Sequence, residues 1–250
     1  MNAYPPHPAN IPQLPRIGIL GGMGPLATAD FFAKLTRATP AEHDQDHFPV
    51  TLESAPQIPD RVAAMQGQGE DVLPALRAVA QRLVVAGCDL IVMPCNTAHL
   101  WHATLAAELP VPFLHIADAV AEQLGSARKL GLMGTTATLT SRLYQHRIAA
   151  TNSACEWALP ADAEMASAVM PGVAAVKRCE ITQARALLLP VAQRLAEQGI
   201  DALVLGCTEI PLAITQADLG VRVIDATDAL ARATVQAALN LRGKVARRAA

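Results

Sequence analysis

The chain has 250 residues, of which 52% are hydrophobic and 17% are charged, a balance typical of a compact protein with a sizeable core. A formal net charge of −2 and an aromatic content of 3% argue against nucleic acid as a partner, because binding it needs basic patches and stacking rings. No apolar run approaches about 18 uncharged residues, so no membrane span is expected. Small molecules are the expected partners.

The N-terminal segment, residues 1–15, has prolines at positions 5, 6, 8, 12 and 15 and lacks the apolar core of a signal peptide. We expect it to be a disordered Pro-rich leader. The five cysteines are odd in number and widely spaced, which is unlike a disulfide framework or a CxxC metal motif. These features predict a cytoplasmic protein.

The first predicted strand, residues 17–20, leads into the loop Gly21-Gly22-Met23-Gly24-Pro25, which opens a helix. The loop lacks the GxGxxG spacing of dinucleotide-binding loops, and Pro25 has no N–H to donate to a phosphate. We expect its backbone to lie close to a small substrate instead.

A long amphipathic helix is predicted over residues 72–86, because apolar residues recur at three- and four-residue spacing before Gly87, a typical C-cap. The strand that follows ends at Cys95 in Met93-Pro94-Cys95-Asn96-Thr97-Ala98-His99. Cys95 and His99 have the one-turn spacing of zinc ligands. The second half of the chain has no matching histidine, so we predict no metal site and expect His99 to pack or hydrogen-bond nearby.

The second half of the chain repeats the first. Residues 17–22, 87–97 and 111–119 match residues 130–135, 199–209 and 221–229, at offsets of 113, 112 and 110. The repeat puts Cys207 in the position of Cys95, after a predicted helix over residues 181–198 that ends at Gly199.

Alternating apolar strands and amphipathic helices indicate parallel sheets that are covered on both faces. We therefore predict an α/β fold with two similar parallel-sheet domains, related by a pseudo-two-fold, and an active site in the cleft between them. The first domain is predicted to comprise residues 16–116 plus 222–250, and the second residues 117–221. Since ligands of open parallel sheets bind beyond the carboxyl ends of the strands, Cys95 and Cys207 should face each other across the cleft.

Two opposed thiols suit a reaction in which a proton leaves one face of a carbon atom and returns to the other. One cysteine, as thiolate, removes the Cα proton of an amino acid, while the other donates a proton to the opposite face. We expect helix N-termini after both thiols to lower their pKa. Donors must stabilise the charge that develops on the α-carboxylate, and this role is assigned to Asn96, Thr97, Thr136, Thr138 and Thr208.

These motifs resemble the aspartate racemase family, within the aspartate/glutamate/hydantoin racemase superfamily. The resemblance runs from about Arg16 to about Ala238 and rests on residues 21–28, 56–61, 93–99 and 206–209. It implies an isomerase that needs no cofactor, and specifically no pyridoxal phosphate, and that is usually a homodimer. The family's two catalytic cysteines match Cys95 and Cys207, and its basic substrate-recognition positions match Arg61 and Lys177, with Arg178 as an alternative to Lys177. Met23 and Gln57, which stand in the matching motifs, are assigned to substrate binding.

The expected substrate is an acidic amino acid. A planar guanidinium suits bidentate carboxylate binding, so Arg61 with Lys177 should select an acidic side chain, and aspartate is the leading candidate. Glutamate racemases carry an Asp-Ser-Gly type element where this chain has residues 21–24, which disfavours glutamate as the sole substrate. The nearest alternative is a broad-specificity amino acid or glutamate racemase. Maleate isomerase or malonate decarboxylase activity is more distant, and an amino-acid-binding protein on the same fold is the non-enzyme alternative.

Overall fold

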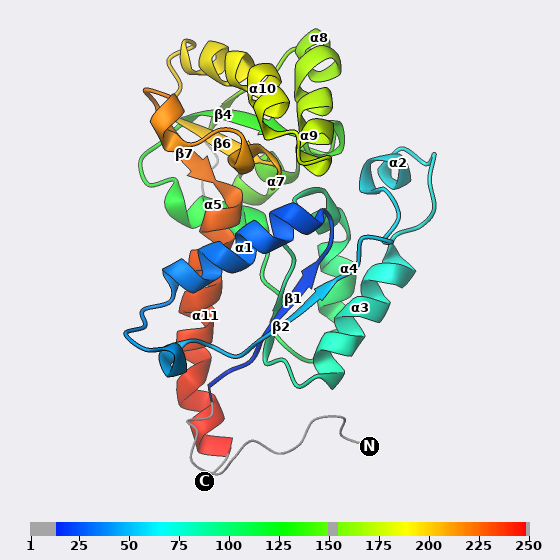
Figure 1. Cartoon of the computed structure of the whole chain (residues 1–250), viewed down its shortest axis with the longest axis vertical. Coiled ribbons are helices and arrows are strands. Elements are labelled where there is room, and N and C mark those ends of the chain that lie inside the picture. The colour runs from blue at the N-terminus through cyan, green and yellow to red at the C-terminus, as the bar shows by residue number, and fades with distance from the viewer. Residues whose placement is uncertain (1–13, 150–154, 249–250) are drawn as a thin grey trace.

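The computed structural model describes residues 14–149 and 155–248, so residues 1–13 of the predicted leader lie outside the described residues. Leu14, at the end of that leader, packs against the hydrophobic core beside the first strand. The chain folds into two parallel sheets surrounded by helices, which confirms the predicted α/β fold (Figure 1).

The first sheet has the strand order β2-β1-β3, and the second has the order β5-β4-β6-β7. The strands are β1 (Ile17–Gly21), β2 (Val50–Ser54), β3 (Leu90–Val92), β4 (Lys129–Gly134), β5 (Glu156–Ala158), β6 (Ala202–Gly206) and β7 (Arg222–Asp225). In each sheet the first strand of the repeat is central, with the second at one edge and the cysteine strand on its other side, so the internal repeat is also a repeat of topology.

Helices connect the strands of the first unit. They are α1 (Pro25–Ala38), the 3₁₀ turn η1 (Asp44–Asp46), α2 (Arg61–Met65), α3 (Leu73–Val85), the 3₁₀ helix η2 (Thr97–Trp101), α4 (His102–Glu108) and α5 (Ile116–Gln123). The helix predicted over residues 72–86 is therefore α3, and Gly87 follows its end at a φ of 77°, a left-handed conformation that glycine adopts without strain.

The second unit carries α6 (Thr136–Thr140), α7 (Leu143–Ala149), α8 (Asp162–Glu164), the π-helix η3 (Met165–Val169), α9 (Met170–Lys177), α10 (Ile181–Ala196), the 3₁₀ turns η4 (Ile210–Leu212) and η5 (Gln216–Asp218), and α11 (Ala226–Arg248). Here α10 is the helix predicted over residues 181–198, and Gly199 follows it at a φ of 68°. No helix within the described ranges is long and apolar enough to cross a membrane.

The third matched segment differs between the units. In the second unit it forms β7, which pairs with β6, whereas in the first unit it makes only an isolated bridge between Phe113 and Ile91. Pro110 and Pro112 precede Phe113, and proline has no N–H with which to extend a ladder. The domain bounds stay a prediction, and β7, at the predicted boundary, belongs to the second sheet.

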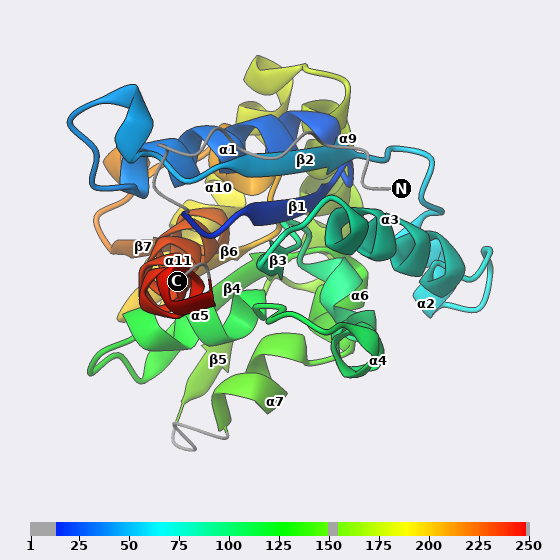
Figure 2. The same cartoon turned by 90° about the horizontal axis from the view of Figure 1, so that it is seen from below.

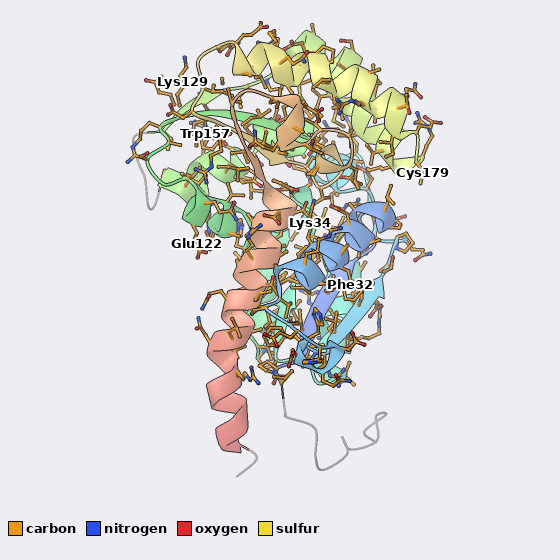
Figure 3. The ribbon with its side chains drawn as sticks, turned by 60° about the vertical axis from the view of Figure 1, so that its left-hand side comes forward. Phe32, Lys34, Glu122, Lys129, Trp157 and Cys179 are labelled. Carbon is orange, nitrogen blue, oxygen red and sulfur yellow. The ribbon has the colours of Figure 1, made fainter. Side chains whose placement is uncertain are left out.

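The long helix α11 joins the two units. It leaves β7 and runs down beside α1 and α5, where Figure 2 shows it end-on next to the first sheet. Lys34, on the face of α1 turned toward α11 (Figure 3), lies 2.6 Å from Asp225 at the end of β7 and 2.5 Å from Asp30. The first unit is thus fastened to the second by a largely buried ion-pair network, which fixes how their strand ends face each other.

Candidate active site

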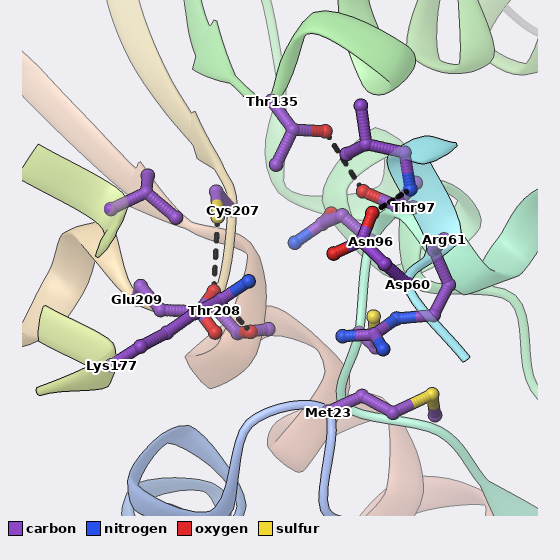
Figure 4. Close-up of a pocket in the computed structure, with 13 residues that line it drawn as sticks. Met23, Asp60, Arg61, Asn96, Thr97, Thr135, Lys177, Cys207, Thr208 and Glu209 are labelled. Atoms are coloured by element: carbon purple, nitrogen blue, oxygen red, sulfur yellow. Dashed lines mark hydrogen bonds between the residues drawn. The ribbon is translucent and has the colours of Figure 1, made fainter. Parts of the chain in front are cut away.

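A pocket lies between the two units, where the strands of both sheets end. The turns after β1 and β3 supply one wall, the turns after β4 and β6 supply the opposite wall, and α2 and α9 close the sides. Its lining residues are Met23, Asp60, Arg61, Val62, Cys95, Asn96, Thr97, Thr135, Val173, Lys177, Cys207, Thr208 and Glu209 (Figure 4). The free space among these side chains is about 20 Å³, enough for a single water molecule.

Cys95 follows β3 and is 5% exposed. Its backbone is held on two sides, because its N–H donates to Met93 O at 2.8 Å and its carbonyl accepts from His99 Nδ1 at 2.8 Å. Burial raises the pKa of the Cys95 thiol and the Glu209 carboxylate adds to that rise, while the positive charges of Arg61 and Lys177 oppose it. Cys95 thus lies buried at the pocket wall, in a lining that also contains Arg61 and Lys177.

Cys207 follows β6 and is 3% exposed. Its Sγ donates to Glu209 Oε2 at 3.0 Å, and Thr208 Oγ1 donates to the same oxygen at 3.2 Å. Burial raises the pKa of the Cys207 thiol well above its ordinary value, and the Glu209 carboxylate raises it further. Both predicted thiols therefore line one pocket, with unlike surroundings.

The pKa of both thiols is raised, so the expectation that helix N-termini lower it is wrong. Cys207 precedes only the three-residue turn η4, whereas Cys95 precedes the 3₁₀ helix η2, which continues directly into α4. The backbone N–H of Ala98 does lower the pKa of Cys95, but the loss of hydration on burial outweighs it.

Threonine hydroxyls connect the two walls of the pocket. Thr97 Oγ1 lies 2.8 Å from Thr135 Oγ1 and 3.3 Å from Thr138 Oγ1, and the latter two are 3.1 Å apart. Thr135, which the sequence analysis did not select, is at the pocket wall, whereas fully buried Thr138 stands behind it. The signal that could have found Thr135 was its place directly after β4, in register with the turn after β1.

Two further predicted residues do not reach this pocket. Thr136 lines a separate, more apolar cavity with residues of α6, η3 and α9, because its side chain lies on the far side of the turn from Thr135. Gln57 is exposed in the turn after β2 and is not among the lining residues. A substrate role for these two side chains stays a prediction.

Asn96 is fixed in orientation by a buried tyrosine. The Tyr144 hydroxyl donates to Asn96 Oδ1, and both residues are almost fully buried. Asn96 Nδ2, in contrast, is buried without a hydrogen-bond partner. Since an unpaired buried donor is costly, this amide is poised to donate to an anionic ligand in the pocket.

The predicted cations lie on opposite sides of the pocket. Arg61 begins α2, and its Nη1 donates to Ile58 O at 3.2 Å and Pro59 O at 3.0 Å, while its buried Nε has no partner. Lys177 ends α9 and lines the same pocket. Its neighbour Arg178, the alternative that the sequence left open, instead pairs with Glu180 on the surface, so Lys177 is the residue brought to the site.

His99 belongs to a buried histidine cluster behind Cys95, as the predicted packing role required. Its ring centroid lies 5.6 Å from that of His102 and 4.8 Å from that of His115. Burial lowers the pKa of all three imidazoles, that of His115 to about 3, so they are neutral near pH 7. Within residues 14–149 and 155–248, no group of three or more His, Cys, Asp or Glu side chains is placed to hold a metal ion.

Comparison with known proteins gives a consistent set of relatives. The family model described as Asp/Glu/Hydantoin racemase matches residues 20–234. An aspartate racemase structure from Picrophilus torridus superposes with a TM-score of 0.81 at 34% identity, covering 90% of this chain and 94% of that one. A broad specificity amino-acid racemase of Bacillus subtilis is 27% identical, over 88% of this chain and 96% of the relative. A glutamate racemase of Deinococcus radiodurans is 33% identical, over 82% of this chain and 66% of the relative.

Proposed function

We propose that this chain, which belongs to the Asp/Glu/hydantoin racemase family and is therefore a racemase, interconverts L- and D-aspartate without a cofactor. The observation that carries the proposal is the pocket itself, into which the two repeats each bring one buried thiol, Cys95 and Cys207. Between them lie donors for one carboxylate and cations for another, as an amino acid with an acidic side chain requires.

In the proposed reaction one cysteine is the base and the other the acid. The thiolate takes the Cα proton, so that an S–H bond forms as the Cα–H bond breaks, and the electron pair passes into the α-carboxylate. The opposite thiol then gives its proton to the other face of Cα. The reverse reaction exchanges the roles of Cys95 and Cys207.

Stabilising the charged intermediate falls to the protein's own donors. The unpaired Nδ2 of Asn96, the hydroxyls of Thr97 and Thr135, and Thr208 surround the space between the thiols. Donors fixed in advance in a site without bulk water stabilise developing negative charge strongly, each by about 3–4 kcal/mol in well-studied oxyanion holes. We assign the α-carboxylate to these groups.

The side-chain carboxylate is assigned to Arg61 and Lys177. Because Nη1 of Arg61 is held by two backbone carbonyls, its unpaired Nε edge is the part left for a ligand. A guanidinium so fixed loses little entropy on binding a carboxylate. The aspartate racemase of Picrophilus torridus, 34% identical, supports this substrate.

A broad-specificity amino acid racemase is the second candidate. Met23, Val62 and Val173 give the pocket apolar wall segments that suit uncharged side chains. The Bacillus subtilis relative, by its name, accepts many amino acids. A panel of L-amino acids analysed by chiral chromatography separates the candidates, since a specific enzyme converts aspartate alone at an appreciable rate.

The test of the proposal is hydrogen exchange at Cα. Aspartate incubated with the protein in deuterium oxide, without pyridoxal phosphate, should racemise and gain deuterium at Cα. Cys95→Ala and Cys207→Ala should each lower racemisation by about 10³-fold or more, because each removes one acid–base group. Cys179→Ala, which changes an exposed thiol outside the pocket, is the control and should keep full activity. Full activity in either pocket variant would exclude the two-cysteine mechanism.

A further inference from the structure

One contact distinguishes the two thiols of the pocket. Cys207 Sγ donates to a carboxylate oxygen, Glu209 Oε2, at 3.0 Å (Figure 4). Cys95 has the same place in the repeat, but in the described part of the chain its Sγ makes no hydrogen bond to a carboxylate; burial raises its pKa, and the charge of Arg61 lowers it. The residue two positions after Cys95 is Thr97, so this carboxylate is present in one repeat only.

Glu209 is held rigidly and is only 4% exposed. Its Oε2 accepts from Cys207 and Thr208, and its Oε1 accepts from the Gly24 N–H at 3.2 Å, across from the loop after β1. No lysine or arginine lies within ion-pair distance of it in the described part of the chain. Oε2 of Glu209 is therefore placed to take the proton of the Cys207 thiol directly.

We propose that Glu209 is the proton acceptor for Cys207, so that this thiol becomes a thiolate by internal transfer and not by losing its proton to solvent. The inference rests on the proposed function. As substrate binds, the Sγ–H bond of Cys207 breaks, an O–H bond forms at Glu209 Oε2, and the electron pair stays on sulfur. Cys207 then removes the Cα proton while Cys95 protonates the opposite face. After product leaves, Glu209 releases its proton to water and the Cys95 thiolate takes one up.

The transfer keeps the charge of the Cys207–Glu209 pair constant. Loss of the proton to solvent would place two negative charges 3.0 Å apart in a buried site, which is why the carboxylate raises the pKa of the thiol. A bound amino acid adds the charges of its ammonium and carboxylate groups to those around the pair. The titratable and charged groups that face the pair are Lys177 from α9, Asp60 and Arg61 at α2, Cys95 after β3, and Tyr144 from α7.

The decisive variant is Glu209→Gln, which keeps the size of the side chain and one acceptor oxygen but cannot take up the proton. The two enantiomers are equally stable, so kcat/KM must fall by the same factor in both directions, and the informative readout is its pH dependence. We expect kcat/KM of the natural protein to be nearly constant between about pH 7 and 9. For Glu209→Gln, kcat/KM should be about 100-fold lower at about pH 7. It should then rise about tenfold per pH unit, since the Cys207 thiol of this variant must lose its proton to solvent.

Two companions separate this role from a structural one. Glu209→Asp keeps a carboxylate and should keep the level profile at a reduced rate. Glu180→Gln, which alters a surface ion pair with Arg178, should leave rate and profile unchanged. A Glu209→Gln variant with the profile of the natural protein, whether fully active or uniformly weakened, would overturn the proposal.

A second measurement needs no activity. In a Cys95→Ala background, the absorbance of thiolate near 240 nm reports the ionisation of Cys207, added to the contribution of the remaining cysteines. Replacing Glu209 by Gln removes a like charge, so in this background the thiolate should form at lower pH, whereas Glu209→Gln in the protein with both cysteines slows racemisation. Thiolate formation at an unchanged or higher pH would contradict the inference. Racemisation that survives Cys207→Ala would instead refute the proposed function, whatever Glu209 does.

Discussion

At the scale of single residues, the proposed function gives Arg61 a role in substrate recognition and the two cysteines a role in proton transfer. Arg61 reaches the site from α2, apart from both thiols in sequence, and its guanidinium is anchored through Nη1. If Arg61 binds the side-chain carboxylate, its loss should harm aspartate alone. If it binds the α-carboxylate, every amino acid should be affected equally.

We expect Arg61→Gln to lower kcat/KM for aspartate by about 100-fold or more, since it leaves a desolvated carboxylate without its charged partner. Activity on alanine or serine, if the natural protein has any, should change by only a few fold. Arg178→Gln is the matched control, because that arginine pairs with Glu180 outside the pocket and should have little effect on either substrate. Equal losses for acidic and neutral amino acids would move Arg61 to the α-carboxylate.

At the scale of elements, the ion-pair network of Lys34 joins α1 to the start of α11. Burial alone would lower the pKa of Lys34, but the carboxylates of Asp225 and Asp30 outweigh burial and raise it. Asp225 also accepts from the Thr227 N–H at 2.8 Å, so it caps α11 as well. Removing Lys34 therefore leaves two poorly hydrated carboxylates beside each other at the junction of the units.

We predict that Lys34→Ala lowers the free energy of unfolding by about 2 kcal/mol, less than for a fully buried pair because the partners are 12–21% exposed. Arg232→Ala breaks a similar pair with Asp228 on α11, but there the arginine is 65% exposed, and the cost should stay within about 0.5 kcal/mol. Urea denaturation near neutral pH measures both. Equal losses in the two variants would mean that the Lys34 network adds no particular stability.

How far the sequence predicted these elements depended on which forces decide them. The strands β1, β3, β4, β6 and β7, with α3, α10 and their glycine caps, follow from local periodicity and backbone conformation, and family membership follows from short motifs, so these were predicted correctly. The edge strands β2 and β5 were not predicted, and the third segment of the first repeat forms a bridge where a strand was expected. The helix expected after Cys207 is reduced to the turn η4, whereas the one expected after Cys95 forms as η2 and α4. The choice between Thr135 and Thr136, and the contact from Glu209 to Gly24, depend on side-chain directions across the cleft, which spacing does not reveal.

At the scale of the whole molecule, the buried histidine cluster ties stability to pH. His115 Nδ1 accepts from the Ala117 N–H at 3.1 Å and thereby caps α5, so this nitrogen must be unprotonated. The rings of His102 and His99 contact that of His115 edge-on, and burial together with the charges of His102 and Arg147 lowers the pKa of His115. Protonation would break the cap and place positive charge in the core.

The sign of the pH effect follows from proton uptake. The pKa of His115 is about 3 in the folded protein and near 6.5 in the unfolded chain, so between these values the unfolded chain binds more protons. The stability that neutral His115 contributes is complete above about pH 6.5 and is lost progressively as the pH falls toward 3. Between about pH 7.5 and 5, His115 alone should cost about 2 kcal/mol, and His99 and His102, whose pKa values are also lowered, should add to it.

His115→Asn isolates this contribution, because asparagine also caps helices but does not titrate. At about pH 7.5 the variant should be within about 1 kcal/mol of the natural protein. Between about pH 7.5 and 5, its free energy of unfolding should fall by about 2 kcal/mol less than that of the natural protein. Urea denaturation at several pH values will measure this difference. Carboxylates cannot imitate the effect, since their unfolded pKa values lie near 4 and they stay ionised across this window. If the free energy of unfolding of the two proteins changed in parallel with pH, the cluster would not be the cause of the loss of stability in acid.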